Sequence, residues 1–159
     1  MAQSYYAIQQ ALDAQFLNTN SGIGLTQWSP TNKTGTFFGE NQTFSLDYFP
    51  SITGKIFARS TLVPMGPQTS TIGIGGYDKI SGVYAIDVMG QLDKGYTATK
   101  QAADRVIAAF PRGLQLTLTT GDQITVETTG IAPIQLGAWA MNKLYCVQVQ
   151  VKWFGYMTP

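Results

Sequence analysis

The sequence predicts a single α+β domain over residues 1–159, built from a mostly antiparallel sheet, two main helices packed on one face of it, and long loops. A chain of 159 residues has the size of one domain. Its apolar residues recur with helical spacing in two segments and with period two in several others, in the order helix, strands, helix, strands. Strict alternation indicates strands with one buried and one wetter face, as in an antiparallel sheet covered by helices on one side.

The first helix is expected over residues 4–18. Ser4 is a favourable N-cap, and the apolar residues that follow it recur three or four positions apart, which places them in one stripe on a helix. These residues are Tyr5, Ile8, Leu12 and Phe16.

The segment from Ser21 to Pro50 is expected to be irregular, with short strands near Ile23–Trp28 and Thr43–Tyr48. It is rich in Gly, Thr, Asn and Ser, yet it also holds six aromatic residues: Trp28, Phe37, Phe38, Phe44, Tyr48 and Phe49. A disordered linker does not carry that many aromatics. We therefore expect these side chains to be buried, either under the loop or in a partner.

Two strands are expected at Lys55–Val63 and Ile80–Leu92, because both segments are rich in β-branched and aromatic residues. The segment that joins them, Pro64–Lys79, is rich in Pro, Gly, Thr and Ser. Hairpin loops usually have about two to five residues. The sequence thus predicts an extended arm or a binding loop here.

A second helix is expected to start at Thr97 or Thr99 and to stop at Pro111, which cannot continue a helix. A hairpin follows, with alternating residues over 114–119 and 124–127 around the turn Thr120-Gly121-Asp122. After an irregular segment through Trp139, the clearest strand runs from Tyr145 to Trp153.

Charged residues make up only 12% of the chain, and ten Lys and Arg against nine Asp and Glu leave a net charge of +1. This balance lacks the basic excess of a dedicated nucleic-acid-binding protein. Interface cores are depleted in charge and enriched in aromatic residues and Met. The composition therefore favours a homo-oligomer with long loops that reach into its neighbours.

The sequence lacks the residues that several kinds of catalytic and metal-binding sites require. The chain has no histidine and one cysteine, Cys146, so histidine-dependent catalytic systems, an internal disulfide and thiolate metal sites are not expected, and neither is any cofactor. The glycines of TIGIGGYDK do not form a phosphate-binding motif. Asp87 stands out because Asp is disfavoured inside a strand; we interpret it as exposed or hydrogen-bonded rather than as a catalytic carboxylate. No continuously apolar window predicts a transmembrane helix.

Most basic residues are scattered, which is typical of a solvated surface. Four of them lie on or beside the second helix and are candidates for one locally positive face. They are Lys94, Lys100, Arg105 and Arg112.

Several segments resemble the tail terminator proteins of long-tailed bacteriophages. The resemblance lies in the run ADRVIAAFPRGLQLTLTTGDQITVETT, the region of Pro133 and Trp139, and the terminal VQVQVKWFGY. It extends to the opening SYYAIQQALDAQF and to GKIFARSTLVP, and so covers most of the chain.

The resemblance implies a non-enzymatic virion protein of the tail or neck that is assembled in the host cytoplasm. Its subunits are expected to form a hexameric ring on the head-proximal end of the tail tube, to stop tube polymerisation and to provide the joint to the head. The implied partners are the tail tube protein and a head-closure or neck protein. DNA is expected to pass through the lumen without sequence-specific binding, and no membrane is involved.

Three regions are candidates for contact with a neighbouring subunit or the tube. The first is the loop Pro64–Lys79, which is apolar in places and has no partner nearby in the sequence. The others are the aromatic stretch Phe37–Phe49 and the C-terminal segment, for both of which packing in the chain's own core is the alternative. The candidate residues are Met65, Ile72, Ile74, Tyr77, Phe37, Phe38, Phe44, Trp153, Phe154 and Tyr156.

Three other functions compete with this one. The chain could be another neck component, a head-closure or tail-completion protein. It could be a monomeric binding module that stacks a ligand on exposed aromatics, for which the candidates are Trp28, Phe37, Phe38 and Trp139. An enzyme that uses carboxylates alone, with Asp87 as its residue, has the least support.

Overall fold

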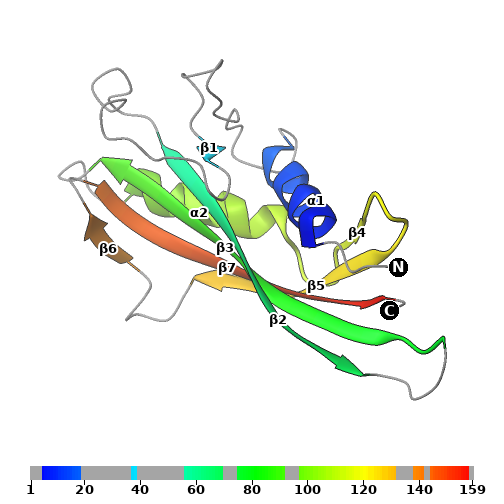
Figure 1. The fold of residues 1–159 in the computed structure, drawn as a ribbon. Coiled ribbons are helices and arrows are strands. Elements are labelled where there is room, and N and C mark those ends of the chain that lie inside the picture. Colours follow the sequence, from blue (N-terminus) through cyan, green and yellow to red (C-terminus); the bar gives the residue numbers. More distant parts are fainter. Residues whose placement is uncertain are drawn as a thin grey trace.

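Both helices pack on one face of a seven-stranded sheet (Figure 1). The structure is a computed structural model and describes residues 5–18, 37–38, 56–69, 75–91, 97–131, 138–141 and 144–157. The elements are α1 (Tyr5–Leu17), β1 (Phe37–Phe38), β2 (Phe57–Thr69), β3 (Asp78–Gln91), α2 (Thr97–Ala109), β4 (Gln115–Thr117), β5 (Gln123–Ile131), β6 (Ala138–Met141) and β7 (Leu144–Met157). The predicted α+β class is confirmed.

The strand order is β1-β2-β3-β7-β5-β4, and β6 also pairs with β7. Every pair is antiparallel except β1 with β2, which is parallel. Because β2, β3 and β7 are long and adjacent, they form the centre of the molecule. The first and second helices and the last strand lie where the sequence predicts them, within a few residues.

The core lies between the helices and one face of this sheet, which we call the helix face. Alternate residues of β7, from Val147 to Trp153, point to this face, and Tyr84, Ile86 and Val88 of β3 lie beside them in register. Both helices contribute buried residues to the same cluster. Those of α1 are Ala7, Ile8, Leu12 and Phe16, and those of α2 include Ala102, Ala103, Val106 and Ala109. The other side of the sheet is called the outer face below.

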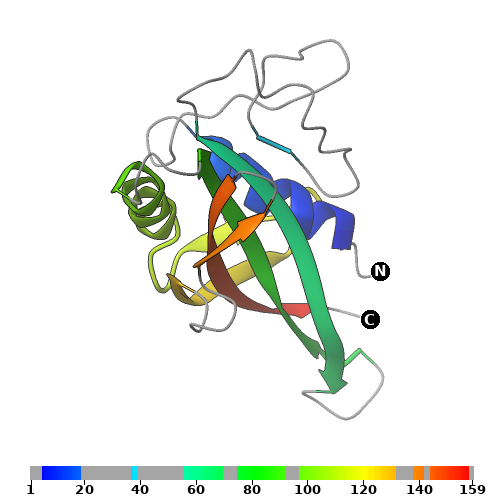
Figure 2. The ribbon, with the colours of Figure 1, turned by 90° about the vertical axis from the view of Figure 1, so that its left-hand side faces the viewer.

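Of the two alternatives predicted for Pro64–Lys79, an extended arm and a binding loop, the structure shows the arm, because residues 64–69 and 78–79 belong to strands. Strand β2 continues to Thr69 and β3 begins at Asp78, and Figure 2 shows this hairpin reaching beyond the other strands as an arm. Pro64 is paired with Gly82. A proline is tolerated there because, among the described residues, β2 has no second neighbour beyond Arg59 and is an edge strand.

Two further differences concern short or extended strands. The segment expected to be irregular through Trp139 contains β6, in which Trp139 lies opposite Cys146 of β7. The last strand runs on to Met157, four residues beyond the predicted end. Strand β6 forms a hairpin with the start of β7, whereas the end of β7 is extended by pairing with the start of β3, which lies far away in the sequence. The strands expected at 23–28 and 43–48 lie outside the described residues.

Gly82 of β3 allows a close approach that no other residue permits. A Cβ atom built on it would lie 2.7 Å from Cζ2 of Trp153 and 2.7 Å from the carbonyl oxygen of Val63. Trp153 is fully buried. The indole ring therefore lies across Gly82 and fills the core at the base of the arm.

Over the described parts of the chain, neither helix has the length and apolar character that a membrane span requires. The same residues hold no group of three or more His, Cys, Asp and Glu side chains that could bind a metal ion.

Candidate interaction surfaces

Exposed apolar side chains gather on the outer face at the arm end of the sheet. The cross-strand register places Val63 opposite Val83, and Met65 opposite Ser81, which is in turn opposite Phe154. Val63 is 50% exposed, Met65 56% and Tyr156 51%. We call this surface the platform and define it by five residues: Val63, Met65, Val83, Phe154 and Tyr156.

The platform has an aromatic and cationic edge. The ring of Phe154 packs edge-on against Tyr156, with centroids 6.1 Å apart. The Lys79 ammonium lies 5.2 Å from the centroid of Phe154, a distance typical of a cation–π contact. Lys152 is exposed and lies opposite Val83. The exposed Glu127 lies in the bulge of β5 next to Thr128, the partner of Lys152, so the apolar surface is bordered by both basic and acidic side chains.

The structure divides the predicted contact residues into three groups. Met65, Tyr77 and Tyr156 are exposed and Phe154 is half-buried, and all four belong to the arm end. By contrast, the side chains of Phe37 and Trp153 have no exposed surface, so they are core residues of the chain itself. Ile72, Ile74 and Phe44 lie outside the described residues, and only the backbone of Phe38 is described.

Phe37, the first residue of the aromatic stretch Phe37–Phe49, is buried in the core. It packs against Phe16 of α1 with ring centroids 4.7 Å apart. This burial also bears on the alternative of a ligand-stacking module, because an aromatic that is 0% exposed cannot stack on a ligand. Of the other three aromatics proposed for that role, Trp28 is not described and no side chain is described for Phe38 or Trp139.

The candidate positive face is split around the helix. Lys100 and Arg105 are both exposed on α2, but residues five positions apart are separated by about 140° around an α-helix. The exposed Asp104 lies between them on the same arc. Arg112 is exposed just beyond the helix, and Lys94 is outside the described residues.

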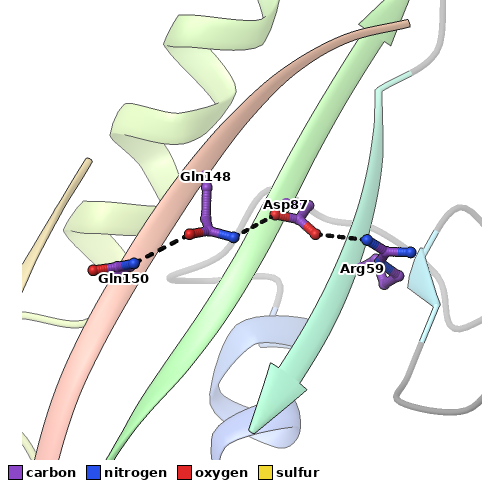
Figure 3. Close-up of polar contacts among 4 residues, drawn as sticks. All are labelled: Arg59, Asp87, Gln148 and Gln150. Atoms are coloured by element: carbon purple, nitrogen blue, oxygen red, sulfur yellow. Dashed lines mark hydrogen bonds and ion pairs between the residues drawn. The ribbon is translucent and has the colours of Figure 1, made fainter. Parts of the chain in front are cut away.

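A polar row crosses the outer face at the other end of the sheet (Figure 3). Arg59, Asp87 and Gln148 lie side by side on β2, β3 and β7. An Arg59 guanidinium nitrogen lies 3.0 Å from Oδ2 of Asp87, and Nε2 of Gln148 donates to Oδ1 at 2.9 Å. Gln150 donates to Gln148 at 3.1 Å.

This row explains the aspartate that the sequence marked as unusual. The Asp87 side chain is only 8% exposed, and each of its two oxygens accepts a hydrogen bond. The interpretation of Asp87 as a hydrogen-bonded residue is confirmed. A catalytic carboxylate needs an oxygen that a substrate can reach. The row itself was missed, although Arg59 and Asp87, two charges inside predicted strands, were the signal for it.

Two buried groups near the sheet centre are held in their neutral forms. Burial, the negative charge of Asp87 and a smaller opposing effect of Arg59 together raise the pKa of Cys146 to about 12. Burial and the Asp13 carboxylate, to which its hydroxyl donates a hydrogen bond, raise the pKa of Tyr84 well above its ordinary value. A thiol with so high a pKa is a poor nucleophile.

The comparison with protein families decides the identity of the chain. A model of the phage tail terminator protein family matches residues 42–153, more than two thirds of the sequence. The chain belongs to the phage tail terminator family. It is thus a structural protein of the virion tail. The matched range includes the arm, the polar row and α2, so the family covers most of the surfaces described above.

Solved structures share the fold of this tail terminator. One solved structure is 16% identical, has a TM-score of 0.64, and matches over 99% of both chains. Another is a chain of the virion of a native gene transfer agent (GTA) particle, 15% identical with a TM-score of 0.52, over 98% of this chain and 100% of that one. A search of the curated proteins found no match.

Proposed function

We propose that this tail terminator forms a closed ring, hexameric as the family resemblance implies, on the head-proximal end of the tail tube. The ring stops tube polymerisation and provides the joint to the head or neck. The family match over residues 42–153 is the observation that carries this proposal.

Physical features of the chain support it. A ring forms when one surface of a subunit binds a different surface of its neighbour and the rotation closes. Such contacts favour apolar, charge-poor patches. The chain is poor in charge, and the platform exposes three large apolar side chains that are each about half exposed. Lateral contacts in the ring leave the axial faces for the tube on one side and the neck on the other.

The experiment compares native mass with tube length. The mass of the purified protein is measured by light scattering on a sizing column, alone and with its tail tube protein, and the tubes are measured by electron microscopy. We expect a ring of about six subunits, and tubes that stop growing when it is added. A protein that stays monomeric with its tube and leaves tube growth unchanged contradicts the proposal; a protein that ignores the tube and binds the head side alone is a head-closure protein instead.

A further inference from the structure

We propose that Pro64 and Pro67 close the open edge of the arm, so that two free copies of this chain do not join by pairing their β2 strands. Such a device goes beyond the proposed ring, because it acts on the free subunit. It depends on the position of β2 at the edge of the sheet, on the composition of the arm, and on the places that the two prolines occupy.

Strand β2 is open along one side of the arm. On that side its neighbour among the described residues is β1, which reaches only Ala58 and Arg59. Every residue from Pro64 to Gln68 is exposed, so this part of the edge faces solvent (Figure 2). An edge strand presents a row of unpaired N–H and C=O groups, which is a template for a strand of another chain.

The arm lacks the charged side chains that commonly protect such an edge. From Ser60 to Tyr77 the sequence contains no Asp, Glu, Lys or Arg, whereas natural edge strands often carry charges, lysine above all. Val63 is 50% exposed and Met65 is 56% exposed. A long edge strand with exposed apolar side chains is a site of unwanted association unless something else interrupts it.

Pro64 removes a donor from the open edge. It is paired with Gly82 in the ladder of β2 and β3. In an antiparallel pair, alternate residues direct their N–H and C=O groups toward the partner strand or away from it. Because proline has no N–H, it fits the ladder where that group would point away from β3. An approaching strand therefore meets a pyrrolidine ring, and no donor, at this position.

Pro67 lies where the ladder itself is interrupted. The register of β2 on β3 shifts between Met65 and Gln68. Gly66 and Pro67 fall inside this bulge, and a bulge bends its strand and increases the twist. Bulges and prolines are both means by which natural edge strands avoid pairing. Together they leave no regular stretch of edge between Pro64 and Gln68.

The contact that this edge would otherwise make is a two-fold pair. Two copies of one edge strand can pair antiparallel about a two-fold axis, with the same surface on both partners. Such a pair is closed and adds no third subunit, whereas the proposed ring needs two different surfaces on each subunit. By closing the edge, the two prolines keep free subunits available for the ring.

The test restores the edge and looks for the two-fold pair. Pro64→Thr with Pro67→Thr returns both N–H groups and introduces residues that favour strands. Met65→Cys is added to this double variant and to the parent, and both are treated with a short bismaleimide; the native Cys146 is fully buried. A two-fold contact brings the two introduced thiols together, whereas a head-to-tail contact joins different surfaces. We expect at least about tenfold more covalent dimer than in the parent, because the restored edge is a template for pairing.

Matched variants separate strand pairing from other effects. Pro111→Thr removes an exposed proline outside the sheet and should leave cross-linking at the parent level. Gln68→Lys, added to the double variant, places a charge on the edge without removing an apolar side chain, and it should suppress the dimer. Circular dichroism checks that each variant folds. If the double variant does not fold, Pro67→Thr alone, in the exposed bulge, is compared in the same way.

Cross-linking of the double variant at the parent level, over a range of protein concentrations, overturns the inference. A dimer that also forms in Pro111→Thr, or that Gln68→Lys leaves unchanged, overturns it too, because such a dimer does not come from the edge of the arm. All measurements use the purified chain without its tube. Failure of the wild-type chain to form a ring with or without the tube therefore counts against the proposed function and leaves this test unaffected.

Discussion

Trp153 lies across Gly82, and this contact has no room for a side chain on the glycine. In Gly82→Ala the new Cβ would meet the indole ring and the Val63 carbonyl, each at 2.7 Å. Because overpacking of a core costs about 1–3 kcal/mol, we expect the free energy of unfolding to fall by about that amount in urea titrations. Gly130→Ala is the matched control, since a Cβ there meets nothing within 4 Å. Equal stability of the two variants would show that the indole ring of Trp153 moves aside without a loss of stability.

Asp87 joins three strands through its two oxygens. Asp87→Ala leaves both the Arg59 guanidinium and the Gln148 amide without their acceptor. We expect a loss of about 1–3 kcal/mol in the free energy of unfolding, because a partly buried donor is left unpaired. The control is Asp104→Ala on the exposed side of α2, which should change stability by less than about 0.5 kcal/mol. Adding Arg59→Met to Asp87→Ala should recover part of the loss.

The two raised pKa values predict a loss of stability in alkali. The folded chain keeps Cys146 neutral up to a pKa of about 12, whereas the unfolded chain releases that proton near 9. Above pH about 9 the unfolded state binds fewer protons than the folded state, so stability falls as pH rises through this window, and Tyr84 acts in the same direction. Urea midpoints between pH 8 and 11 measure the slope, and Cys146→Ala should flatten it. An unchanged slope in that variant contradicts the assignment to Cys146.

At the scale of the elements, the proline, glycine and threonine of Pro64–Lys79 left open whether the segment is an extended arm or a binding loop. In the structure β2 and β3 remain paired from Phe57 and Met89 as far as Thr69 and Asp78. Turn-forming residues are tolerated in β2 because its other side is an edge. The arm therefore places the platform on paired strands rather than on a loop.

The turn between β4 and β5 offers a test at the same scale. Gly121 has φ +90°, a conformation that L side chains rarely adopt, and its N–H donates to the Leu118 carbonyl at 2.9 Å. We expect Gly121→Ala to lower the free energy of unfolding by about 1 kcal/mol through backbone strain. Gly66→Ala in β2, where a Cβ meets nothing within 4 Å, should have little effect. Thermal unfolding of the Gly121→Ala and Gly66→Ala variants measures both effects. A Gly121→Ala variant as stable as the wild type would mean that the turn changes its backbone conformation without strain.

At the scale of the whole molecule, the proposed ring is expected to form through charge-poor surfaces, since only 12% of the residues are charged. Exposed ion pairs are screened at high salt, whereas apolar burial is not. We therefore expect the ring to persist when sodium chloride is raised from about 50 mM to about 500 mM, at which the Debye length has shortened to a few ångströms. Sedimentation velocity measures the change. Dissociation at the higher salt concentration would point to the lysines and to an electrostatic contact instead.

The spacing of residues along the chain was enough to predict the two helices and the last strand. The stripe of α1, the proline-terminated α2 and the alternation in β7 place apolar side chains on one side of their own element, and that depends only on the spacing of neighbouring residues. The order of these elements indicated the α+β class, and the resemblance of several sequence runs to tail terminator proteins indicated the family. The sequence also showed that Asp87 is unusual, because Asp is disfavoured inside a strand.

Only the tertiary structure decided which side chains are buried and which strands pair. It decided that Phe37 and Trp153 belong to the core whereas Met65 and Tyr156 remain exposed, although the sequence made all four candidates for contact with a neighbour. It also decided the length of the arm and the pairing of β6 with β7. The physical reason is that side-chain burial and strand pairing depend on which segments meet in the fold, whereas spacing along the chain reports only which side of an element a residue occupies.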